Sequence, residues 1–199
     1  MLMDPMPDEI LRLFYGVMLP APVQQEIAAL QQRLAGSGVR IKWVEPENLH
    51  VTLKFLGELP AQAARDLKLL GHKLAAEVSP WDVQVQGLSA FPKVSRPQTL
   101  WLGIGQGLEA FAHLGKLLNR KLEDEMIAGG DAKPFHPHCT LGRVRQDGGL
   151  SRLVELMHQD LDFTSQAFGC DRFQLMCSKL ERTGPTYRVL GEFHLGRRG

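Results

Sequence analysis

A four-residue pattern occurs twice in this chain, and its spacing restricts the backbone that can carry it. The segment His50–Leu53, His-Val-Thr-Leu, returns 88 residues later as His138–Leu141, His-Cys-Thr-Leu. With this composition, chance alone gives about 0.03 His-x-Thr-Leu segments. Residues i and i+2 of a β-strand lie on one face, so each copy predicts a strand that presents an imidazole beside a hydroxyl. The sequence therefore predicts two equivalent strands, and two such strands facing one cleft would suit acid–base chemistry on an anion such as phosphate.

The rest of the chain mixes strand patterns with helix patterns. Strand patterns occur over 11–19, 50–55, 81–88, 100–104 and 137–144, in part of 163–180, and over 187–195. Apolar residues with a period near 3.6 predict helices over 22–34, 60–78, 108–126 and 150–158. Strict β–α alternation is absent, which favours the α+β class. We expect a pseudo-duplicated fold with one His-x-Thr strand central in each of two lobes, packed as a single domain over 1–199.

The composition limits which kinds of partner and which cellular compartment are expected. A formal net charge of +1 argues against a broad basic surface for long duplexes. The chain shows neither an apolar run of the ~18 residues that a membrane span needs nor a secretory signal. Three cysteines without paired spacing predict reduced thiols rather than a disulfide framework or a zinc site. We expect a cytoplasmic protein with no membrane partner, and a monomer because this length can bury its own core.

Several segments around the two His-x-Thr-Leu copies, here called the tetrads, resemble one known family. They are 12–14, 48–57, 91–92, Arg96 with 100–103, and 135–143. In these segments the chain resembles the 2H phosphoesterase superfamily, and more closely its bacterial and archaeal RNA 2′,3′-cyclic phosphodiesterases, historically called 2′-5′ RNA ligases. The resemblance implies a bilobal fold in which two mostly antiparallel sheets flank a central cleft, with helices on the outer faces. It also implies metal-independent opening of a 2′,3′-cyclic phosphate to a 2′-phosphomonoester, on RNA ends or nucleotides and without a cofactor.

The same resemblance implies roles for the tetrad residues. Hydrolysis needs an acid and a base, and histidine suits both because its ordinary pKa, near 6.5, lies close to working pH. The family pattern assigns His50 as proton donor to the leaving ribose oxygen and His138 as proton acceptor from water; sequence symmetry alone does not distinguish them. Thr52 and Thr140 are expected to donate hydrogen bonds to the non-bridging phosphate oxygens. An ordinary β-branched strand residue is the competing interpretation of each threonine.

Further candidate substrate contacts lie near the tetrads: Arg12, Phe14, Lys54, His136 and Arg143. Strand alternation places Lys54 on the face of His50, where a solvated lysine is the competing interpretation. The same alternation turns Arg143 away from the cleft unless a bulge re-aims it. Arg12 and Phe14 are expected to contact the nucleoside through charge and stacking, with core packing as the alternative for Phe14. Trp101 is expected in the core.

Three alternatives stay open from the sequence. His136 and His138, with His50 as a third ligand, suggest a zinc site, although the threonines would then have no role. Reversible 2′-5′ ligation or cleavage would use the same four tetrad residues. A nucleotide- or RNA-binding module without turnover is the third alternative, and two titratable imidazoles argue against it.

Overall fold

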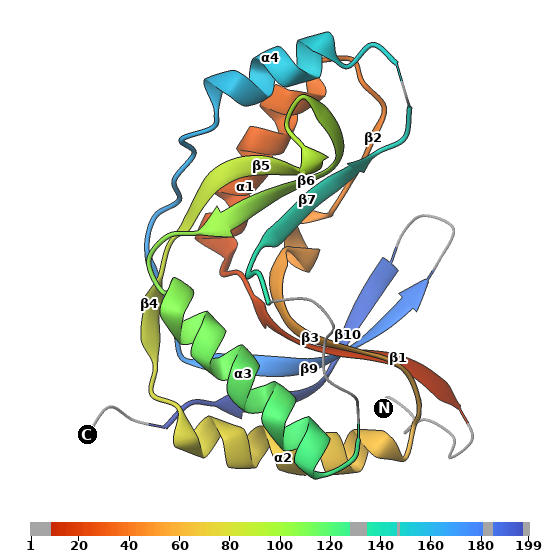
Figure 1. Ribbon diagram of the computed structural model, residues 1–199, viewed down its shortest axis with the longest axis vertical. Helices are drawn as coiled ribbons and strands as arrows, with labels where there is room; N and C mark the ends of the chain where they lie inside the picture. The colour runs from red at the N-terminus through yellow and green to blue at the C-terminus, as the bar shows by residue number, and fades with distance from the viewer. Residues whose placement is uncertain (1–8, 128–134, 147, 181–184, 197–199) are drawn as a thin grey trace.

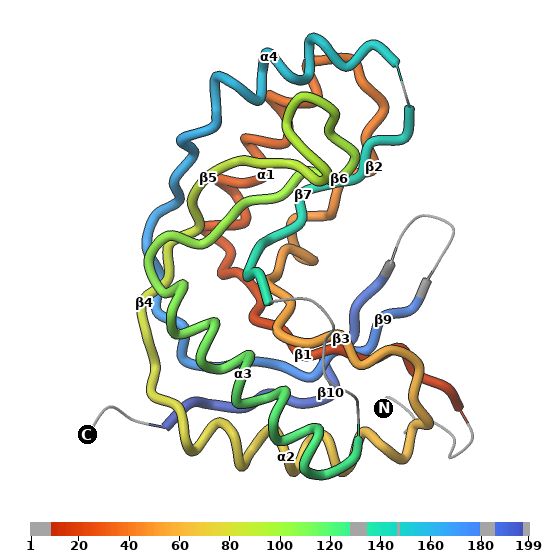
Figure 2. Tube along the Cα trace, viewed as in Figure 1, coloured from red at the N-terminus to blue at the C-terminus, as the bar shows by residue number. Residues whose placement is uncertain are grey.

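The computed structural model describes residues 9–127, 135–146, 148–180 and 185–196, and it confirms the predicted α+β class (Figures 1 and 2). Its strands are β1 (Ile10–Met18), β2 (Ile41–Trp43), β3 (His50–Pro60), β4 (Trp81–Val83), β5 (Val85–Lys93), β6 (Arg96–Ile104), β7 (Cys139–Val144), β8 (Phe168–Cys170), β9 (Arg172–Leu180) and β10 (Pro185–His194). Its helices are α1 (Ala21–Ala35), α2 (Ala63–Glu77), α3 (Leu108–Asp124) and α4 (Ser151–Gln159), with a 3₁₀ turn at Pro46–Asn48. The helix expected from residue 60 begins later because β3 continues to Pro60.

One large antiparallel sheet has the strand order β10-β9-β1-β3-β7-β6-β5, and β2 pairs with β7; β4 and β8 form a small second sheet. The large sheet is divided where the two His-x-Thr strands meet. Along the described strands, β3 pairs with β7 through Val51 opposite Cys139. Both side chains are 0% exposed. The x residues of the two tetrads therefore form the junction, and the His and Thr residues flank it.

The two halves on either side of this junction interleave in sequence. Strands β1, β3, β9 and β10 lie with α2 and α3, whereas β2, β5, β6 and β7 lie with α1 and α4 (Figure 1). Gln31 of α1 donates from Nε2 to the carbonyls of Val44 (2.8 Å) and Leu141 (3.0 Å). Tyr15 of β1 donates from its hydroxyl to the Leu67 carbonyl of α2 (2.5 Å). The two His-x-Thr strands thus belong to different halves, each with its own helices, but the lobes are not consecutive halves of the chain. Strand β7 lies between β2 and β6, whereas β3 is the last strand of its half and not a central one as expected.

Periodicity explains why these helices form and how they pack. In α1, Val23, Ile27, Leu30 and Leu34 recur along one face and are buried against the sheet, with proline in the first turn. The backbone N–H of Gly36 caps the last turn. The buried side chains of both halves form one continuous apolar cluster. Among the described residues, none of the helices has the length and apolar character to cross a bilayer.

A bulge at the last residue of the first tetrad changes which side chains face the cleft. On β1, Tyr15 lies opposite Lys54 and the next residue, Gly16, lies opposite Thr52, so Leu53 has no partner. An extra residue of this kind reverses strand alternation beyond it. Lys54 is consequently 4% exposed on the buried side of the strand. The predicted placement of Lys54 on the cleft face is therefore wrong.

The second tetrad has a bulge at the equivalent residue. On β6, Leu100 lies opposite Gly142 and Trp101 lies opposite Thr140, so Leu141 is passed over. Alternation is reversed here as well, and Arg143 comes to the side of Thr140. The duplication seen in the sequence thus extends to an irregularity of the backbone.

Candidate active site

A cavity of about 350 Å³ lies between the two halves, at the junction of β3 and β7. It is lined by both histidines and both threonines of the tetrads, together with residues of β1, β9 and β10. The lining residues are Arg12, Phe14, Val44, His50, Thr52, Phe55, His138, Thr140, Arg143, Ser178 and Tyr187.

The two imidazoles are held in the same way. His50 Nδ1 lies 2.6 Å from the Asn48 carbonyl oxygen, and His138 Nδ1 lies 2.7 Å from that of His136. A carbonyl oxygen only accepts, so Nδ1 must carry the proton and donate in both cases. In the neutral form Nε2 of each ring is then the basic nitrogen. It is also the atom that gains or loses a proton.

The Thr52 hydroxyl is hydrogen-bonded to Nε2 of His50, the ring nitrogen that does not contact a carbonyl. Its Oγ1 lies 3.1 Å from His50 Nε2. While His50 is neutral, the Thr52 hydroxyl donates to Nε2. Once His50 is protonated, Nε2–H becomes the donor and the hydroxyl hydrogen of Thr52 is released to another acceptor.

Aromatic rings pack against both imidazoles. The His50 ring centroid lies 5.0 Å from that of Phe14 and 5.2 Å from that of Tyr187, which meets it edge to face. The His138 centroid lies 5.5 Å from that of Phe91 and 5.8 Å from that of Trp101. These rings limit rotation of the imidazoles and shield part of each from water, so that both histidines are half-buried.

Trp101 is half-buried beside the site and stacks on the exposed ring of Phe91, with centroids 5.0 Å apart. It was expected in the core, and that expectation is wrong because the bulge in β7 places it opposite Thr140. Gly16 on β1 lies close to the Val51 backbone and to the first imidazole. A Cβ at this position would lie 3.1 Å from the Val51 carbonyl oxygen and 3.5 Å from His50 Cδ2.

Burial lowers the pKa of both histidines. For His50, desolvation is the main cause, the Asn48 carbonyl opposes it, and the nearby His138 lowers the pKa further. For His138, desolvation again dominates, opposed by the His136 carbonyl and reinforced by the His136 ring. With each pKa below 6.5, both rings are predominantly neutral in the free protein at pH 7.

The cavity gathers most, but not all, of the predicted contacts. Arg12 and Phe14 line it, and the bulge brings Arg143 in, where its guanidinium donates to Thr99 Oγ1 at 3.4 Å. Lys54 does not line it, and neither does the exposed ring of His136, whose carbonyl instead positions His138.

Four lining residues were not predicted: Val44, Phe55, Ser178 and Tyr187. Phe55 occupies the place expected for Lys54, and the Arg12 guanidinium lies 4.8 Å above its ring centroid. Burial raises the pKa of the Tyr187 hydroxyl, while Arg12 and Arg143 oppose that rise. No local signal in the sequence singled out Ser178 or Tyr187.

The zinc arrangement considered from the sequence does not form in the described part of the chain. There, no three His, Cys, Asp or Glu side chains lie close enough together to hold one metal ion. Nδ1 of both His50 and His138 is already bonded to a backbone carbonyl.

The sequence resembles those of other proteins along most of its length. A profile described as LigT like Phosphoesterase matches residues 17–101, which include the first tetrad. A protein of Aquifex aeolicus named RNA 2′,3′-cyclic phosphodiesterase is 32% identical over 94% of this chain and 99% of its own. One of Thermus thermophilus with the same name is also 32% identical, over 93% of this chain and 90% of its own.

Solved structures agree with the sequence comparison. A Thermus thermophilus protein superimposes with a TM-score of 0.78 at 29% identity, covering 94% of this chain and 100% of that one. Escherichia coli LigT in its apo form shares the fold, with a TM-score of 0.73 at 23% identity over 95% and 99% of the two chains. These likenesses confirm the resemblance seen in the tetrads, and the chain belongs to the LigT-like phosphoesterases of the 2H family.

Proposed function

We propose that this protein hydrolyses 2′,3′-cyclic phosphates of RNA ends and nucleotides to 2′-phosphomonoesters, without a metal ion. The observation that carries the proposal is the matched pair of imidazoles. His50 and His138 line one cavity, each donates from Nδ1 to the carbonyl two residues before it, and each retains Nε2 for proton transfer. Relatives over most of the chain are named RNA 2′,3′-cyclic phosphodiesterases, which supports the same reaction.

In the proposed step, His138 Nε2 takes a proton from a water molecule, whose oxygen forms a new bond to phosphorus. The bond from phosphorus to O3′ breaks, and His50 Nε2 supplies the proton that makes O3′ a hydroxyl. Water is thereby added across the cyclic ester, leaving the phosphate on O2′. Each proton transfer contributes a factor of about 10² to 10⁴ in rate.

The contact between Thr52 and His50 supports this assignment of roles. An acid must begin the step protonated, and a protonated His50 releases the Thr52 hydroxyl to donate to a non-bridging phosphate oxygen. Thr140 donates from the opposite side of the cavity, and Arg12 and Arg143 supply positive charge there. Donors placed in advance around a phosphate stabilise the charge that develops in the transition state.

Phosphorus NMR of a 2′,3′-cyclic mononucleotide incubated with the protein and EDTA tests the function. We expect the cyclic resonance to be replaced by that of the 2′-monophosphate, because the proposed acid and base are both side chains. An unchanged spectrum with saturable binding would indicate a binding module instead. If turnover occurs without EDTA and is lost when EDTA is added, the reaction uses a metal-activated water.

The lowered pKa values predict an acid-shifted pH profile. In the free protein one imidazole must be protonated and the other neutral, and burial lowers the pKa of both. Each proton is therefore lost at a lower pH than usual, so both limbs of the kcat/KM bell move to lower pH. We expect its maximum below about pH 6.5, whereas the kcat maximum lies higher because a bound phosphate anion raises both pKa values. Initial rates from about pH 4.5 to 9 measure both profiles, and a flat kcat/KM would contradict the two-histidine mechanism.

A further inference from the structure

A second cavity, of about 250 Å³, adjoins the proposed catalytic cavity. Arg143 lines both. The other walls come from the first residues of β6, from the end of β7 and the residues after it, and from the residue that precedes α4. They are Arg96, Pro97, Gln98, Thr99, Val144, Arg145, Gln146 and Leu150. The second cavity therefore continues the first along the outer end of the β6–β7 pair.

This second cavity is strongly basic. Arg96, Arg143 and Arg145 all line it and are all exposed, and none of its described lining residues is acidic. We call the three residues the arginine groove. The Arg143 guanidinium donates to a neutral partner, Thr99 Oγ1, so this bond does not offset its positive charge. At the tip of the β5–β6 hairpin, Lys93 lies opposite Arg96 and adds to the positive charge.

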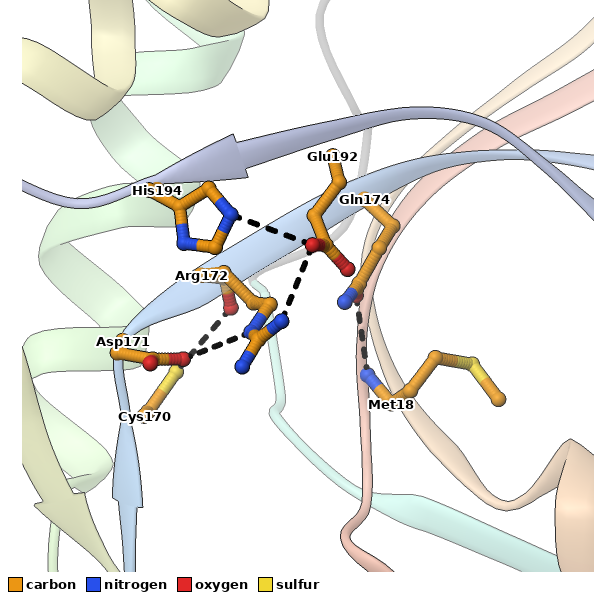
Figure 3. A network of polar contacts seen from close by, with 7 residues as sticks. All are labelled: Met18, Cys170, Asp171, Arg172, Gln174, Glu192 and His194. Atoms are coloured by element: carbon orange, nitrogen blue, oxygen red, sulfur yellow. Dashed lines mark hydrogen bonds and ion pairs between the residues drawn. The ribbon is translucent and has the colours of Figure 1, made fainter.

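A third cavity shows how a surface arginine differs when its charge is already neutralised. Arg172 donates from Nε to Asp171 at 2.8 Å and from NH1 to Glu192 at 3.0 Å, and His194 also contacts Glu192 (Figure 3). These groups line a cavity of about 240 Å³ or lie beside it. Its positive charge is matched by two carboxylates, so it offers little to an anion. Among the described residues that line the arginine groove, there is no carboxylate to offset the positive charge.

We propose that the arginine groove binds the phosphodiester immediately 5′ of the reacting phosphate, so that the preferred substrate is an RNA chain rather than a free cyclic nucleotide. The inference rests on the proposed function, since a 2′,3′-cyclic phosphate stands at the 3′ end of an RNA and the rest of the chain leaves in the 5′ direction. A chain leaving the catalytic cavity past Arg143 enters the groove directly. Guanidinium groups suit phosphate because their N–H donors form a planar fork.

The backbone around Arg145 holds the far end of the groove in place. Its N–H donates to the Arg40 carbonyl at 2.8 Å, and its own carbonyl accepts from the Arg40 guanidinium at 2.8 Å. Arg143 and Arg145 are two residues apart on extended chain, which separates their Cα atoms by about 7 Å. The groove thus offers a second cationic position about one nucleotide away from the catalytic cavity.

The test compares kcat/KM for a 2′,3′-cyclic mononucleotide with kcat/KM for di- and tetraribonucleotides that end in the same cyclic phosphate. We expect the oligonucleotides to be the better substrates. The double variant Arg96→Gln/Arg145→Gln should lower kcat/KM for the oligonucleotides about tenfold and leave the mononucleotide unchanged, since both residues lie outside the catalytic cavity. The slope of log kcat/KM against log salt should fall by about 0.7 for each phosphate of a single strand that the variant no longer neutralises.

Arg65→Gln serves as the matched control, because this exposed arginine of α2 lines neither cavity. It should change neither substrate's rate nor the salt slope. If the mononucleotide is hydrolysed but oligonucleotides are no better, or if the double variant lowers both substrates equally, the groove has no such role while the proposed function stands. If neither substrate is hydrolysed, the proposed function fails. The role of the groove is then tested by measuring how salt changes the affinity of the protein for a 3′-phosphorylated tetraribonucleotide. If the double variant and the unmodified protein bind it with equal affinity, the groove has no such role.

Discussion

Replacement of His50 or His138 by alanine is expected to lower kcat/KM for 2′,3′-cyclic phosphates by about 10² to 10⁴. Each variant loses one of the two proton transfers, while both threonines and the opposite imidazole remain. The double variant should be little slower than the slower of the two single variants, because the effects of losing groups that act in one step are not additive. Initial rates on a cyclic mononucleotide measure the loss. His113→Ala, an exposed histidine of α3, is the control and should retain full activity.

The fold of these variants needs a separate check, because the His50 ring packs between Phe14 and Tyr187. His50→Gln fills more of this space than alanine. It should be as inactive as His50→Ala but have a melting temperature close to that of the unmodified protein. The pH profiles of the residual rates test the roles. Loss of His138 should remove the acidic limb and loss of His50 the basic limb. The opposite order would mean that the roles are exchanged, and near-normal turnover of either variant would refute the mechanism.

Thr52→Val and Thr140→Val are each expected to lower kcat by about 10² to 10³, the loss typical of one donor to developing negative charge. Valine nearly matches threonine in shape and suits a strand, so melting temperatures should change little. Thr164→Val is the control, since its exposed hydroxyl donates to the Asp162 carbonyl outside the cavity.

The two threonine variants should differ in pH dependence. Thr52→Val also removes the partner of His50 Nε2, so it should move one limb of the profile. Thr140→Val should lower the rate with less change in shape. A rise in KM with unchanged kcat would show that these hydroxyls bind ground state and transition state equally, which would contradict their proposed role.

Strand alternation was sufficient to predict the inner part of the site. It placed His50 and Thr52 on one face and Val51 on the other, and the structure buries Val51 fully while the other two line the cavity. The same rule was wrong for Lys54 because Leu53 is passed over in the pairing with β1. A bulge depends on the register of two strands, which the local pattern of one strand does not contain.

The outer part of the site depends on contacts between distant segments. Ser178 and Tyr187 reach the cavity because β9 lies beside β1 and β10 beside β9. That strand order is a property of the whole sheet, so neither residue carried a signal of its own. Trp101 illustrates a further limit. Its neighbours alternate as a buried strand does, yet its ring is stabilised by stacking on Phe91 at the rim of the cavity.

The narrow pairing of Val51 with Cys139 has a mechanical consequence. The large sheet continues from one half of the molecule to the other through this point, so a relative bending of the halves would have its axis close by. In a rigid rotation, displacement grows with distance from the axis. His50 and His138 are the immediate neighbours of the paired residues and would move least, whereas the edge strands β10 and β5, which lie furthest from the junction in the strand order, would move further. Such a bending motion would widen the opening of the cavity for substrate and product, while the distance between Nε2 of His50 and Nε2 of His138 stayed nearly constant.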